Sequence, residues 1–238
     1  MDVLLSEGFD FTHADSLCEY TFMEQSCLLG KIDFVKWFIE NSINIRRYRY
    51  EFCYAAEKNN IELVKLLLNN EYSASDVDES GRNGLHYAAQ ENNIDMCRLL
   101  IECNCAVNQL DESGQSPLYI AAGENNIEIA KMLLLRHAKV DICGIGDGTT
   151  PFMIACAFGN YDICDLLISF DADIDMQDSD GRTALIFAAI KSDAKCIEYL
   201  LSHGADTSIT DKDNIGFYDI QSNSDLREKL YYEEFIAD

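Results

Sequence analysis

The segment Ser116-Pro117-Leu118-Tyr119-Ile120-Ala121-Ala122 decides the fold, because variants of it recur along the chain at nearly constant spacing. Clear copies start at Asn83, Thr150 and Thr183, and weaker copies start at Thr21, Tyr50 and Gly216. Successive copies are 29, 33, 33, 34, 33 and 33 residues apart. A period of this length indicates a repeat architecture in which each repeat is one small supersecondary unit.

Two patterns within each repeat predict a pair of helices. Ala-Ala in the first segment lets two helices approach closely, and a later pair of bulky residues supplies an apolar stripe at helical spacing. Those pairs are Leu67-Leu68, Leu100-Ile101, Leu133-Leu134, Leu166-Leu167 and Leu200-Leu201. Ser or Thr at the start of the first segment suits a helix N-cap, and Pro117 and Pro151 suit the next position.

Turn residues separate these helices. The turn between the two helices of a repeat requires a left-handed residue, which is Gly or Asn here. The residues at this turn are Gly30, Asn59, Asn92, Asn125 and Gly159. Between repeats, residues 78–81, 111–114 and 178–181 have hairpin-turn composition, so we expect them to project as a row of fingers.

These features resemble the ankyrin-repeat family, whose pattern T-P-L-H-x-A-A is followed by a second helix and G-A-D. Residues 81–89 and Gly204-Ala205-Asp206 match it clearly. The resemblance implies an all-α fold, an ankyrin-repeat solenoid of stacked helix-turn-helix units with β-hairpin fingers. No Pro/Gly/Ser-rich linker breaks the chain, so we expect a single domain over residues 1–238.

The repeats are expected to start near residues 21, 50, 83, 116, 150 and 183, and the two ends differ from them. Residues 1–15 read as a partial N-terminal repeat, which is either a shortened cap or the remainder of upstream repeats. Residues 216–238 read as a degenerate C-terminal cap with a polar outer face, in which Leu226, Leu230 and Tyr231 are spaced to dock.

The formal net charge of −24 comes from 42 acidic and 18 basic residues among 238. Nucleic acids gain affinity from phosphate neutralisation by Lys and Arg, so this charge disfavours binding to DNA, RNA or anionic lipid. The acidity either steers in a partner with a basic surface or only keeps the surface soluble. We expect a monomer with a protein partner, no nucleic acid and no membrane.

Cysteine placement indicates a reducing compartment. Six of the ten cysteines fall at core or near-core positions of the repeat, which favours free buried thiols over disulfides. They are Cys27, Cys53, Cys97, Cys156, Cys164 and Cys196. No apolar run approaches the roughly 18 residues of a membrane span, and residues 1–8 do not resemble a secretion signal. We expect a cytoplasmic protein, with the nucleus as the alternative.

No constellation in the sequence predicts catalysis. His86 occupies the histidine of the family pattern, where the imidazole hydrogen-bonds neighbouring backbone. Cys103 and Cys105 form a lone C-x-C, which is weak zinc evidence. Residues 144–148 superficially resemble a phosphate loop, but they lie in a finger and no Lys-Ser or Lys-Thr follows. We expect no enzymatic activity, no cofactor and no metal.

In the family, partners usually dock on the concave face, formed by finger tips and exposed positions of the first helices; we call it the finger face. The residue just before Ala-Ala is apolar or aromatic in successive repeats: Tyr54, Tyr87, Ile120, Ile154 and Phe187. These side chains are either anchors for a partner or packing between neighbouring repeats.

Residues after Ala-Ala are expected to be more exposed. Phe158 and Ile190 are apolar at such positions, so we expect them to extend a hydrophobic contact patch. Glu91 and Glu124 occupy the same part of their repeats. Finger residues would form a polar rim around this apolar centre, and among them are Arg82 and Arg182.

Residues 46–50 concentrate three of the eighteen basic residues at the short 29-residue step. They either bind an acidic or phosphorylated peptide or offset nearby acids such as Glu40 and Glu51. Overall we expect a non-enzymatic scaffold or adaptor that binds a partner on the finger face. The alternatives are a regulatory inhibitor or assembly factor that occludes its partner, and the targeting module of a larger multidomain protein.

Overall fold

The computed structural model describes residues 22–41, 50–143 and 146–235, and the chain divides into two compact units, 1–109 and 110–238. The helices of the first unit are α2 (Phe22–Leu28), α3 (Ile32–Glu40), α4 (Tyr50–Glu57), α5 (Ile61–Leu68), α6 (Gly84–Gln90) and α7 (Ile94–Glu102). Those of the second are α8 (Pro117–Gly123), α9 (Ile127–Leu134), α10 (Pro151–Phe158), α11 (Tyr161–Ile168), α12 (Ala184–Lys191), α13 (Ala194–Ser202), α14 (Phe217–Ser222) and α15 (Ser224–Phe235).

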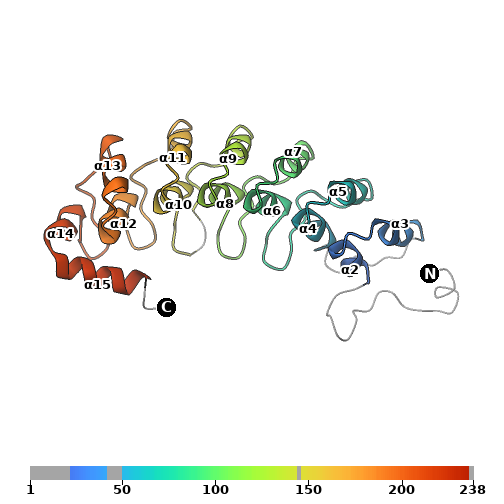
Figure 1. Ribbon diagram of the computed structural model, residues 1–238, viewed down its shortest axis with the longest axis horizontal. Helices are drawn as coiled ribbons and strands as arrows, with labels where there is room; N and C mark the ends of the chain where they lie inside the picture. The colour runs from blue at the N-terminus through green and yellow to red at the C-terminus, as the bar shows by residue number, and fades with distance from the viewer. Residues whose placement is uncertain (1–21, 42–49, 144–145, 236–238) are drawn as a thin grey trace. The chain divides into compact units, whose positions relative to one another are not determined.

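The helices of each unit alternate between two roles (Figure 1). The first helix of each repeat packs on the first helix of the next repeat. In the first unit α2 packs on α4 and α4 on α6, and in the second unit α8 packs on α10, α10 on α12 and α12 on α14. Each first helix also packs against the helix that follows it. Every described first helix starts within one residue of its predicted start, so the predicted stack of helix pairs is confirmed.

The core of each unit lies between its two layers of helices. The Ala-Ala residues are nearly inaccessible to solvent, and one leucine of each second-helix pair is fully buried. These leucines are Leu67, Leu100, Leu133, Leu167 and Leu200. Burying a leucine contributes about 1.5–3 kcal/mol to the stability of the fold. Each repeat gains this contribution where it packs on its neighbour. The stripe predicted from the sequence is therefore the packing surface.

Helix caps and left-handed turns follow the sequence. The hydroxyls of Ser116 and Thr150 accept hydrogen bonds from backbone N–H groups at 3.1 and 3.2 Å, which caps α8 and α10. Asn59, Asn92 and Asn125 have φ of 52°, 53° and 58°, as predicted for the turn inside each repeat. These local choices fix the angle at which the first helix leads into the second.

The fingers are tight turns rather than paired strands. In the finger at residues 78–82, Asp78 N–H donates to Arg82 O at 2.9 Å, and the Asp78 carboxylate accepts from Ser80 N and Arg82 N. This carboxylate completes the hydrogen bonding of the turn, so the β-hairpin predicted at residues 78–81 is reduced to a single backbone closure. Within the described ranges the one β-bridge joins Thr210 and Gly216.

Two sequence-based interpretations lie outside the described residues, namely the partial repeat at residues 1–15 and the arginines of residues 46–49. The six cysteines predicted to be buried are buried and form no disulfide within the described residues, and Cys105 is buried as well. That the whole chain forms one domain stays a prediction.

Candidate binding surface

The finger face of the first unit is polar and held together by hydrogen bonds. Tyr54 and Tyr87 are half-buried on α4 and α6. The Tyr87 hydroxyl donates to the Asp78 carboxylate in the finger, and burial, reinforced by this bond, raises the pKa of Tyr87. Arg82 Nη1 donates to Gln90 Oε1 at 3.2 Å, and Gln90 Nε2 donates to the exposed Glu91 at 3.4 Å. These contacts join the finger to the first helix.

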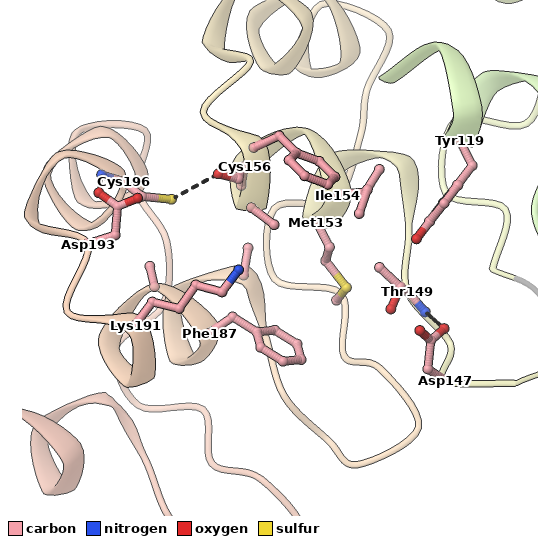
Figure 2. Close-up of a pocket in the computed structure, with 14 residues that line it drawn as sticks. Tyr119, Asp147, Thr149, Met153, Ile154, Cys156, Phe187, Lys191, Asp193 and Cys196 are labelled. Atoms are coloured by element: carbon pink, nitrogen blue, oxygen red, sulfur yellow. Dashed lines mark hydrogen bonds between the residues drawn. The ribbon is translucent and has the colours of Figure 1, made fainter. Parts of the chain in front are cut away.

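The finger face of the second unit contains a pocket of about 220 Å³ (Figure 2). It brings together three of the residues singled out from the sequence, Ile154 and Phe158 of α10 and Phe187 of α12. Ile154 and Phe158 are four residues apart and therefore share one face of α10. Phe158 is 67% exposed, as expected from its position after the small-residue pair.

Polar groups flank this pocket at opposite ends in Figure 2. At the finger end, the Asp147 carboxylate accepts from Thr149 N–H at 2.9 Å. Burial raises the pKa of Tyr119 on α8, and the negative charges of Asp147 and Asp111 raise it further. Lys191 and Asp193 lie at the other end. The Asp193 carboxylate caps α13 by accepting a hydrogen bond from Cys196 N–H at 3.0 Å.

The expectation that Ile190 extends the exposed patch is wrong, because Ile190 is only 2% exposed. Helix α15 packs on α12 and covers this position, and Ile190 borders a hollow of about 320 Å³ that Ser224, Arg227 and Tyr231 of α15 also line. Ile190 therefore belongs to the packing of the C-terminal cap.

The other candidate positions of this unit lie outside the pocket lining. Ile120 is 8% exposed, so packing between neighbouring helices accounts for it. Glu124 is exposed just beyond α8. The Arg182 guanidinium lies 5.9 Å from the centre of the Phe187 ring, which places a finger cation over an aromatic ring of the pocket.

Sequence reasoning missed several pocket residues. Met153 and Ala157 lie beside Ile154 and Phe158 on α10, and their i, i+4 spacing was the available signal. Asp147 belongs to the finger that makes the repeat step 34 rather than 33 residues, which marked this repeat as different. Lys191 ends α12, and Asp193 joins the site from the turn that follows, which sequence alone does not place.

Chemistry-bearing side chains elsewhere serve the fold. Asn83 N–H donates to His86 Nδ1 at 3.1 Å in a fully buried setting, which confirms the structural role predicted for His86. The Cys156 and Cys164 thiols are 3.6 Å apart, and neighbouring thiols with burial raise the pKa of Cys156. Across the described part of the chain, no group of three or more His, Cys, Asp or Glu side chains is arranged to hold a metal ion.

Every helix in the described ranges is too short or too polar to traverse a bilayer.

Comparison with known proteins supports the repeat assignment. The profile of a family described as ankyrin repeats (3 copies) matches residues 52–144 and 134–211. A segment of 76 residues, 32% of the chain, is 38% identical to the mouse ankyrin repeat and SAM domain-containing protein 6 and covers 9% of that protein. Another of 80 residues, 33% of the chain, is 40% identical to the human transient receptor potential cation channel subfamily A member 1 and covers 7% of it. The matches therefore span a small part of each relative.

Proposed function

Because this chain belongs to the ankyrin-repeat family, we propose that it is a non-enzymatic scaffold that binds a protein partner through the finger face. The observation that carries the proposal is the pocket of about 220 Å³ that Ile154, Phe158 and Phe187 line. An aromatic side chain left 67% exposed beside an apolar pocket is the arrangement that a partner covers when it docks.

The negative charge of the second unit indicates which kind of protein partner the finger face would bind. Residues 110–238, which carry the pocket, hold 24 acidic and nine basic residues. An excess of acids steers a basic protein surface toward the face and repels nucleic acid and anionic lipid. We propose a monomeric cytoplasmic protein, or a nuclear one, whose partner has a basic surface.

One finding favours a second candidate, the targeting module of a larger protein. The matched segments are 9% and 7% of the two relatives, so repeats like these occur within much longer chains. The binding chemistry proposed for the finger face would be the same in that setting. A regulatory inhibitor or assembly factor stays the other alternative, distinguished by loss of the partner's activity on stoichiometric addition.

Capture of binding proteins on the immobilised chain tests the scaffold, with partners identified by mass spectrometry and then purified. The double variant Tyr87→Ala and Phe187→Ala should weaken binding of the purified partner by about tenfold or more, since interface aromatics dominate binding energy. Tyr161→Ala, on the second helix α11, removes a comparable ring from the other layer and should leave affinity unchanged. Circular dichroism checks that each variant stays helical. If the folded double variant binds like the wild type, the finger face is the wrong surface.

A further inference from the structure

The volume of the pocket between α10 and α12 limits what it holds. Pockets for drug-sized molecules usually enclose about 300–1,000 Å³. This pocket encloses about 220 Å³, and the side chains of Met153, Ile154, Phe158 and Phe187 make its centre apolar. Space of this size and character suits one large apolar side chain of a partner rather than a whole cofactor.

The two ends of the pocket differ in charge. At the α13 end, Lys191 and Asp193 contribute one charge of each sign, and Figure 2 shows the Lys191 side chain directed away from Asp193. At the finger end, Asp147 lines the pocket, and its charge and that of Asp111 both act on the Tyr119 hydroxyl. Figure 2 shows this hydroxyl directed toward Thr149 and Asp147. The local field at the finger end therefore favours a cation next to the apolar centre.

The charged groups around the finger end do not cancel its preference for a cation. The next finger contacts this one through Ser179 N–H, which donates to Asp147 O at 2.7 Å, and it carries two more acids, Asp178 and Asp180. Its one base, Arg182, lies over the Phe187 ring. The backbone N–H of Thr149 already donates to one carboxylate oxygen of Asp147, which orients the carboxylate toward a second partner.

We infer that this pocket is an anchor site for a basic segment of a partner protein, which inserts one large apolar side chain and places an adjacent Lys or Arg against Asp147. The inference rests on the proposed function and names the chemistry recognised at that face. Apolar burial supplies the affinity, and the acidic finger end selects basic neighbours of the anchor over acidic ones.

Three capped tripeptides test the inference directly: acetyl-Arg-Phe-Arg-amide, acetyl-Arg-Ala-Arg-amide and acetyl-Glu-Phe-Glu-amide. The readout is the ¹³C-methyl NMR signal of Met153, which lines the pocket, and the buried Met96 of the other unit is an internal control. We expect acetyl-Arg-Phe-Arg-amide to shift the Met153 signal saturably and leave the Met96 signal unmoved. Replacing Phe by Ala should weaken binding at least about tenfold. Replacing Arg by Glu should weaken it at least about fivefold.

Two variants locate the contacts. Asp147→Asn should lower affinity for acetyl-Arg-Phe-Arg-amide about two- to fivefold, while Asp213→Asn makes the same charge change in another finger and should leave affinity within error. Ala157→Leu fills the pocket from an exposed position of α10, so it should lower affinity about tenfold without disturbing the core.

The outcomes separate the two proposals. Absence of a saturable Met153 shift, or equal binding of the basic and acidic Phe peptides, overturns the anchor site. If the captured partner then still depends on Tyr87 and Phe187, the proposed function stands without it. Conversely, the anchor site is supported if Ala157→Leu and Asp147→Asn both weaken binding of the peptide. That holds even when the double variant binds the captured partner as tightly as the wild type does.

Discussion

At the residue scale, the turn that follows each second helix from α5 to α13 has a left-handed backbone whatever residue occupies it. Glu71, His137 and Asp171 have φ of 67°, 63° and 64°, whereas Gly204 fills the equivalent turn with φ of 86°. A side chain in this conformation costs roughly 1–2 kcal/mol through contact between Cβ and the backbone, and glycine avoids that cost. Repeats therefore differ in stability by a single turn residue.

Exchanging residues at these turns should change stability in opposite directions. Asp171→Gly should raise the free energy of unfolding by about 0.5–1 kcal/mol, the relieved strain less the added freedom of the unfolded chain. Gly204→Ala should lower it by about 1 kcal/mol through the backbone alone, because no atom lies within 4 Å of the added Cβ. Urea denaturation measures both. A stabilising Gly204→Ala would contradict the strain argument.

A second residue-scale prediction concerns Asp141, whose pKa is raised by burial and by the nearby charge of Asp173. A carboxyl group with a higher pKa folded than unfolded binds more protons folded, so its ionisation lowers stability as pH rises past its ordinary value of 3.8. Asp141→Asn keeps an acceptor for Asp173 N–H and should stabilise the fold at pH 7, by less than about 1 kcal/mol after solvent screening.

This gain should shrink as pH falls toward 3.8, since the wild-type carboxyl group then becomes neutral too. Denaturant midpoints between pH 7 and that range measure the trend. Asp162→Asn, at an exposed position of α11, makes the same charge change and serves as the control. If both variants stabilise equally at pH 7, net charge rather than the setting of Asp141 is responsible.

Residue types predicted turns and caps well because those depend on one residue and its neighbours. Asn at the turn inside each repeat and Ser or Thr at the N-cap needed no tertiary information. The burial of Ile190 could not be predicted in this way, because it depends on α15, which begins more than thirty residues later in the chain. Ser192 likewise adopts φ of 57° in a turn where the sequence pattern expects Gly or Asn.

At the element scale, α15 closes the apolar end of the second unit. Leu230 is 4% exposed on α15, and this helix contacts both α12 and α14. The sequence predicted a docking helix from the spacing of Leu226, Leu230 and Tyr231. It could not predict which surface α15 covers, because the spacing fixes one face of a helix but not its partner.

Leu230→Ala should therefore lower the free energy of unfolding by about 2–3 kcal/mol, the cost of a buried leucine plus the cavity it leaves. Tyr231→Ala, next in the chain but 40% exposed, should cost less than half as much. Hydrogen exchange should show the loss of protection first in α12 and α14, which α15 contacts. Equal costs for the two variants would mean that α15 does not dock through Leu230.

At the scale of the whole molecule, periodicity made the repeats visible, since a buried residue recurs wherever a repeat meets its neighbour. Three of the residues that the repeat pattern assigned to the finger face, Ile154, Phe158 and Phe187, line one pocket, while the role of that face in binding stays a prediction. The pocket itself was not predictable, because it needs Asp147 and Asp193 from two turns whose geometry a repeat pattern leaves open. Charge, by contrast, is fully known from composition and acts on every repeat.

The net charge of −24 should make the fold more stable as salt is added. Like charges repel more strongly in the compact state than in the expanded chain, and about 0.1 M salt screens charges more than roughly 10 Å apart. Raising sodium chloride from about 0.02 to 0.3 M should therefore raise the free energy of unfolding by about 1 kcal/mol. In urea denaturation this appears as a higher midpoint with an unchanged m-value. The triple variant Glu112→Gln, Glu124→Gln and Asp213→Asn removes three exposed acids and should respond less steeply to salt. An equal response in the variant, or a midpoint that falls with salt, would show that local ion pairs rather than net repulsion set the electrostatic stability.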